Sequence, residues 1–296
     1  MNINTIFKPY RLKFSFTLLL IFTEAALTIL FPLFIGYAID SAIQGSYQGS
    51  LQLGGLGVVA LVIGVGRRVF DSRFYAKVYQ DLGAQVISKM EEEVPSKKSA
   101  RLGMIRELVE FLENSLPELI GNVIGLIGVV AIIATLNLNV FYGSLIVTVL
   151  VFLIYGTTSA KTIRLNKSAN DELEKQVTVI ATKDRRRLER HLGEMMKWNV
   201  KLSDLEAINF SISWVVLIAF LVGSVMISVS DGMVKYGALF SLIMYVFQYM
   251  ENVINLPLFY QNYLRLREIK ARLEYVQQFP RPHSRMSRPR STVAPG

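Results

Sequence analysis

Six near-continuous apolar runs dominate the hydrophobic pattern of this 296-residue chain. Each run reaches about 18 residues or more, close to the about 20 residues that a helix needs to cross a bilayer. A transmembrane β-barrel would need many segments of about 10 residues with alternating polarity, and these runs do not alternate. The pattern therefore predicts six transmembrane helices at 14–39, 51–69, 119–136, 138–155, 210–229 and 236–262.

The composition agrees with an all-α membrane protein. Hydrophobic residues make up 52% of the chain and its mean hydropathy is +0.38, more than an ordinary soluble domain carries. The first run is too long for a signal peptide and lacks a cleavage site of small residues, so we expect a permanent span. The absence of cysteine excludes disulfides, thiolate metal sites and cysteine nucleophiles.

The connections between the runs alternate between short and long, so the two kinds are predicted to lie on opposite sides of the membrane. Of the 32 Lys and Arg residues, all but Lys235 fall before the first run, at the end of the second run (Arg67 and Arg68), in the two long connections or after the sixth run. By the positive-inside rule, both termini and both long connections are expected in the cytoplasm, most simply at a bacterial inner membrane. Topology thus accounts for the net charge of +9 without a nucleic-acid partner, and a basic patch for anionic lipid stays open.

Both long connections keep apolar residues at helical spacing, with breaks near Pro95 in the first and Thr182 in the second. We interpret each as a helical hairpin that extends the spans about 35 Å into the cytoplasm at about 1.5 Å per residue. The alternative is a pair of small separate domains, but neither connection has strand patterning or a core of its own.

Six spans with two long cytoplasmic hairpins resemble the six-helix transmembrane domain of ABC exporters over about residues 1–276. The segment "NTIFKPYRLKF" is similar to the elbow helix, "FPLFIGYAID" to the end of the first span, and "RLREIKARLEYV" to the helix that leads to the ATPase. The resemblance implies a homodimer. It also implies coupling segments at about 96–103 and 179–185 that dock on the ATPase, through Ser99, Arg101, Leu102, Ile180, Thr182 and Lys183.

The sequence departs from that family because it has no G-x-x-x-x-G-K-[ST] loop to hold phosphates. We therefore expect no catalytic residue, no ATPase activity and no cofactor in this chain, with ATP acting only through a separately encoded partner. His191, on a hairpin among arginines, and His283 are distant in sequence, so we expect no metal site.

Polar residues interrupt the sixth run at helical steps, at Gln248, Glu251 or Asn252, and Asn255. Glu24 in the first run lies at a comparable predicted depth. An acid that faces lipid is costly, so each must face a cavity, find a partner or stay protonated. The stripe therefore predicts either the wall of a water-filled pathway or interhelical hydrogen bonding.

Two arginines, one proline and the C-terminal residues give three further predictions. Arg67 and Arg68, at the end of the second run, are expected to snorkel to the cytoplasmic surface without a substrate role. Pro257 is expected to kink the sixth helix. Residues 277–296, rich in proline and arginine, are predicted to be a disordered basic tail.

Three functions fit these observations. The first is the transmembrane subunit of an ABC-type transporter that works with a separate ATPase. The second is a motorless proton-coupled transporter of the same fold, driven through Glu251 and Glu24. The third is a non-transporting membrane scaffold or sensor whose hairpins recruit a partner.

Overall fold

The computed structural model describes residues 10–88, 94–232 and 235–256, and in these ranges the chain is helical apart from short connections. Six helical stretches in this part of the chain are long and apolar enough to cross a membrane. The elements in chain order are α2 (Arg11–Ile43), α3 (Gln48–Ser88), α4 (Pro95–Glu110), a π-helical turn η2 (Phe111–Ser115), α5 (Leu116–Leu136), α6 (Leu138–Glu174), α7 (Gln176–Ala181), α8 (Arg185–Ser230) and α9 (Tyr236–Ile254).

The predicted spans agree with these helices. The first five lie within α2, α3, α5, α6 and α8, and the sixth begins with α9 at Tyr236. The last residues of the sixth span lie outside the described residues. The same holds for the expected kink at Pro257, the helix "RLREIKARLEYV", the predicted tail and residues 4–9 of the expected elbow.

Local side-chain chemistry sets several helix ends. The Asn137 side chain accepts a hydrogen bond from the Val140 backbone N–H at 3.0 Å and so caps the start of α6. Asp184 caps α8 in the same way. Gly45 and Gly232, with φ of 76° and 78°, adopt the left-handed conformation directly after α2 and α8, which glycine reaches without strain. These features let the chain reverse direction within a few residues.

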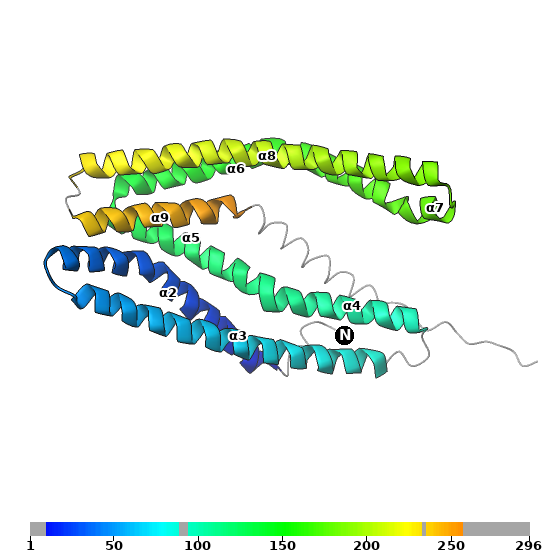
Figure 1. Cartoon of the computed structure of the whole chain (residues 1–296), viewed down its shortest axis with the longest axis horizontal. Coiled ribbons are helices and arrows are strands. Elements are labelled where there is room, and N and C mark those ends of the chain that lie inside the picture. Colours follow the sequence, from blue (N-terminus) through cyan, green and yellow to red (C-terminus); the bar gives the residue numbers. More distant parts are fainter. Residues whose placement is uncertain (1–9, 89–93, 233–234, 257–296) are drawn as a thin grey trace, which may run out of the picture.

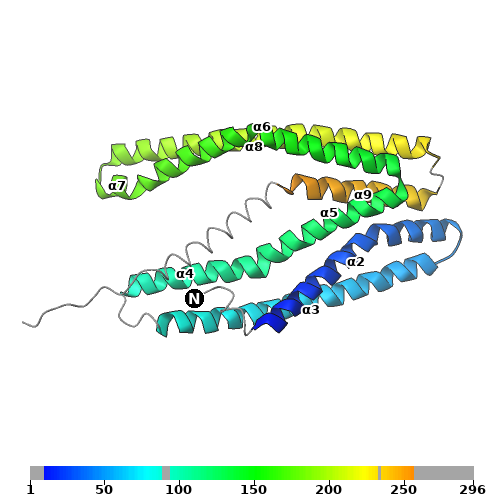
Figure 2. The same ribbon diagram turned by 180° about the vertical axis from the view of Figure 1, so that it is seen from behind.

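The helices gather at one end of the molecule and separate at the other (Figures 1 and 2). The gathered end holds the connections α2–α3, α5–α6 and α8–α9, and we call it the short-connection end. At the opposite, arm end, α6, α7 and α8 form one arm and α3 with α4 forms the other. The long connections are thus helical extensions of the spans, as the sequence predicted.

The two predicted turn segments differ in structure. Residues 96–103 do not form a turn, because α4 begins at Pro95 and continues through them. Proline fits the first turn of a helix, where its missing N–H is not needed, so it starts α4 here. The second segment does contain a turn, between α7 and α8, where Lys183 has φ of 53°.

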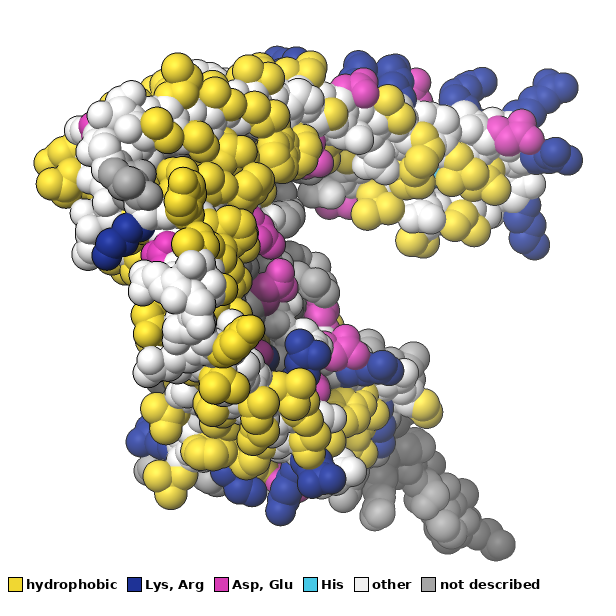
Figure 3. Space-filling view, turned by 60° about the vertical axis from the view of Figure 1, so that its left-hand side comes forward, with side chains coloured by type: hydrophobic (Ala, Val, Ile, Leu, Met, Phe, Trp, Pro, Cys, Tyr) yellow, Lys and Arg dark blue, Asp and Glu magenta, His cyan; other side chains and the backbone are white. Residues whose placement is uncertain are grey.

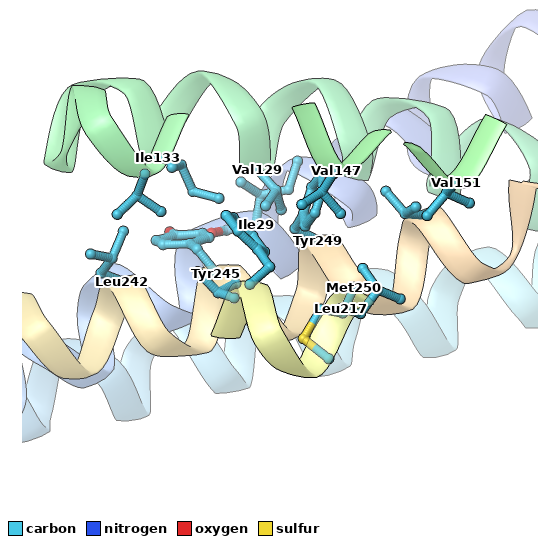
Figure 4. Close-up of a cluster of buried hydrophobic side chains, with 14 residues drawn as sticks. Ile29, Val129, Ile133, Val147, Val151, Leu217, Leu242, Tyr245, Tyr249 and Met250 are labelled. Atoms are coloured by element: carbon cyan, nitrogen blue, oxygen red, sulfur yellow. The ribbon is translucent and has the colours of Figure 1, made fainter. Parts of the chain in front are cut away.

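The main core surrounds α9, which packs against α2, α5 and α8. Figure 4 shows its side chains meeting residues from the neighbouring helices. The Tyr245 hydroxyl donates to the Ile29 carbonyl of α2 at 2.6 Å, and the Tyr249 hydroxyl bonds to Thr148 of α6 at 2.7 Å. The buried members of this core are Ile29, Val129, Ile133, Val140, Val147, Val151, Leu217, Phe220, Leu242, Tyr245, Val246, Tyr249, Met250 and Val253.

Small residues bring α2 and α9 into close contact near the short-connection end. A Cβ on Gly36 would lie 2.0 Å from Ser241 Oγ and 2.3 Å from the Gly237 carbonyl oxygen, so only glycine fits there. The Ser241 hydroxyl donates to the Pro32 carbonyl at 2.7 Å, and Asp40 accepts from the Gly237 N–H at 2.8 Å. These contacts fix α9 beside α2 and direct the remaining face of α9 away from the core.

Candidate substrate pathway

A cavity of about 750 Å³ lies among α2, α3, the η2–α5 segment and α9. Four of the five predicted pathway residues line it: Glu24, Gln248, Glu251 and Asn252. Asn255 follows the end of α9, is half-buried, and is not part of the described lining. The structure thus brings together the acids of two helices that are distant in sequence.

Helix α9 divides into an apolar face and a polar face. Tyr245 and Tyr249 are fully buried in the core, whereas Gln248 and Glu251 face the cavity and Glu251 is exposed. Residues three or four positions apart share one face of a helix, so each of these two pairs occupies its own face of α9. The polar stripe of α9 therefore lines a cavity, which favours the pathway interpretation over interhelical packing for these residues.

Arg67 does not snorkel as predicted. Its side chain is only 14% exposed and forms two ion pairs, through Nε with Glu24 of α2 and through Nη1 with Asp71 at 3.0 Å. The second carboxylate oxygen of Asp71 accepts a hydrogen bond from the Thr17 hydroxyl at 2.8 Å. The forked guanidinium donates hydrogen bonds to both carboxylates, and these stabilise the charge of Arg67 inside the protein. The side chain therefore does not have to extend to the membrane surface.

One wall of the cavity was not predicted from the sequence. Glu113, Asn114, Glu118 and Asn122, on η2 and α5, also line it. Glu113, Asn114 and Glu118 precede the predicted third span at 119–136, whereas Asn122 lies within it. The signal was present in the polar residues Asn114, Glu118 and Asn122, which recur at steps of four and so share one helix face.

Charged residues gather on this inner side of the molecule. Figure 3 shows acidic and basic side chains on the concave surface between the arms, while much of the outer surface is apolar. The described lining carries five carboxylates, from Glu24, Asp71, Glu113, Glu118 and Glu251, against two guanidinium groups, from Arg67 and Arg68.

The predicted coupling residues fall at the ends of both arms. On α4, Ser99 is exposed and Arg101 is half-buried. Leu102 packs toward α3, where its Cδ2 atom lies 3.3 Å from the point that a Cβ added to Gly83 would occupy. Near the end of the other arm, Ile180 lies in the last turn of α7, and Thr182 and Lys183 form the following turn. All three of these are exposed.

His191, which the sequence places on a hairpin among arginines, is buried on α8. It is 4% exposed, and its Nδ1 lies 2.7 Å from a Glu172 carboxylate oxygen on α6. The pair joins α6 and α8 within their arm. The surrounding arginines, Arg185, Arg186, Arg187 and Arg190, are exposed.

The comparisons with known proteins agree with this architecture. The model of the family described as ABC transporter transmembrane region matches residues 3–237, most of the chain. The search of curated proteins finds no match. Six membrane-spanning helices, two long helical arms and this family match together establish an integral multi-pass membrane protein that belongs to the ABC transporter transmembrane region family.

Proposed function

We propose that this chain is the transmembrane subunit of an ABC-type transporter, that two copies form the substrate pathway, and that a separately encoded nucleotide-binding ATPase drives it. The family match supports a role in membrane transport. The observation that carries the proposal is the cavity beside α9, where Gln248, Glu251 and Asn252 form a polar wall within helices otherwise suited to lipid. Polar and ionisable residues at such positions are expensive unless they serve a pathway or a partner.

The arm ends support a docking role. Val177 and Ile180, on the short helix α7, have exposed fractions of 78% and 55%. Apolar side chains on a helix end distant from the spanning segments favour a protein partner. In this proposal α7 and the start of α4 contact the ATPase, ATP binds only to that partner, and both arms and termini lie in the cytoplasm.

Co-purification from the native membrane tests this proposal. In mild detergent, the full chain should recover a P-loop ATPase. Ile180→Asp and Lys183→Glu should reduce the amount of ATPase recovered severalfold. The first introduces a negative charge on the docking surface and the second reverses a positive one. Lys197→Glu, on the same arm but away from its end, is the matched control and should leave recovery unchanged. Recovery of no ATPase by the wild-type chain would contradict the subunit role.

A proton-coupled transporter is the second candidate, and Glu251 favours it. This carboxylate is exposed to the cavity and has no ion-pair partner among the described residues. In proteoliposomes without ATP, transport should then follow an imposed pH gradient, and Glu251→Gln should abolish it. Glu189→Gln, an exposed acid of α8, should not affect it. Transport that needs ATP and tolerates Glu251→Gln would exclude this candidate.

A further inference from the structure

The carboxylates of the cavity divide into a neutralised and an uncompensated group. Arg67 forms ion pairs with both Glu24 and Asp71, so these two acids are already occupied. Glu113, Glu118 and Glu251 have no ion pair within the described part of the chain. With Arg68 as the remaining cation of the described lining, the cavity carries an excess of negative charge.

The same cavity has an apolar portion. Ile29 and Val129 are buried in the adjoining core, and Ile21, Ala25 and Pro117 complete this part of the lining. Apolar walls lower the local dielectric and strengthen the field of the nearby carboxylates. A ligand that suits the whole lining therefore combines a positive charge with an apolar body.

We propose that the cavity binds organic cations that carry an apolar body, with Glu113, Glu118 and Glu251 as the binding carboxylates. Arg67 is a positioning residue in this site, because it holds Glu24 and Asp71 against the wall and leaves the other three acids to the ligand. The inference rests on the proposed function and adds the substrate class to it.

Two probes of matched shape and opposite charge test the substrate class. Binding of tetraphenylphosphonium and of tetraphenylborate to the purified full chain in lipid nanodiscs is measured by equilibrium dialysis, with empty nanodiscs subtracted. Glu113→Gln and Glu251→Gln, made separately, should each weaken tetraphenylphosphonium binding roughly tenfold, the equivalent of one modest charge interaction. Tetraphenylborate binding should stay equal or increase. Glu189→Gln, far from the cavity, should change neither.

The outcomes separate the inference from the proposed function. Selective loss of the cation in either cavity variant supports the cationic class, and size-exclusion elution at the wild-type volume identifies the variants that remain folded. Two outcomes overturn the cationic class. In the first, a cavity variant loses affinity for both probes equally. In the second, the wild-type chain binds tetraphenylphosphonium no more tightly than the two cavity variants do. ATPase co-purification is scored on the same preparations. If it persists while the cation preference is absent, the substrate class is wrong and the subunit role stands.

Discussion

At the scale of single residues, Arg67 joins two helices through charge. It contacts Glu24 of α2 and Asp71 of α3, and the side chains of the two acids are 28% and 4% exposed. The sequence identified Glu24 as an acid that needed a partner or a cavity, and the structure provides both. Its partner could not be predicted, because an arginine at the end of a span can either snorkel or turn inward with the same local sequence.

We predict that Arg67→Met destabilises the protein strongly. Removing the guanidinium leaves two carboxylates without their shared partner, which costs about 3–5 kcal/mol for a buried pair. Thermal unfolding in detergent should show a clear fall in Tm. Arg67→Lys should recover part of the loss, because one ammonium cannot reproduce both directed hydrogen bonds.

Arg68→Met is the matched control for that substitution. Arg68 is the exposed neighbour on α3, and no ion pair with described residues holds it. Its replacement should change Tm little. Equal effects at positions 67 and 68 would show that the Arg67 network does not stabilise the fold.

At the scale of elements, the pairing of α2 with α9 determines where the polar face of α9 points. Apolar periodicity predicted α9 and its polar stripe, but not the helix on which its other face packs. Gly36 and Gly237 allow the two backbones to approach, and Asp40 bonds to the N-terminus of α9. Many glycines in the chain could serve such a contact, so the choice depends on the assembled bundle.

Gly36→Ala should destabilise the protein, whereas Gly57→Ala should not. A Cβ at Gly36 meets backbone and Ser241 atoms at 2.0–2.9 Å, whereas at Gly57 nothing lies within 4 Å. We expect Gly36→Ala to destabilise by about 1–3 kcal/mol through overpacking. Gly57→Ala should be neutral or stabilising by up to about 1 kcal/mol, because alanine favours a helix. Chemical unfolding of both variants in the same detergent measures the difference, and a destabilised Gly57→Ala with an unaffected Gly36→Ala would refute the close contact.

At the scale of the whole molecule, the cavity results from the separation of the helices toward the arm end. Four segments contribute to its lining, and no single segment encloses it. Water should therefore reach its polar wall, while the outer faces of the bundle contact lipid.

Introduced cysteines can test this arrangement, because the chain has none of its own. Asn122→Cys and Gln248→Cys, on the cavity wall, should react with a membrane-impermeant maleimide, since the reacting thiolate requires a hydrated position. Val149→Cys lies on α6, is 57% exposed and belongs to an apolar span, so lipid should protect it. Labelling is measured by a gel shift in membranes opened to the reagent. Equal labelling at the three positions would contradict a water-filled cavity bounded by lipid-facing helices.

The sequence by itself determined the class of protein, the six spans and the two helical arms. These depend on the length and period of apolar runs, which are local properties because a bilayer requires about 20 apolar residues whatever their neighbours are. Only the tertiary structure decided that Glu24 meets Arg67, 43 residues away, and that Glu113 and Glu118 face the same cavity as Glu251. Such relations depend on which helices pack together and on their rotation about their own axes, and the apolar residues that fill a span determine neither.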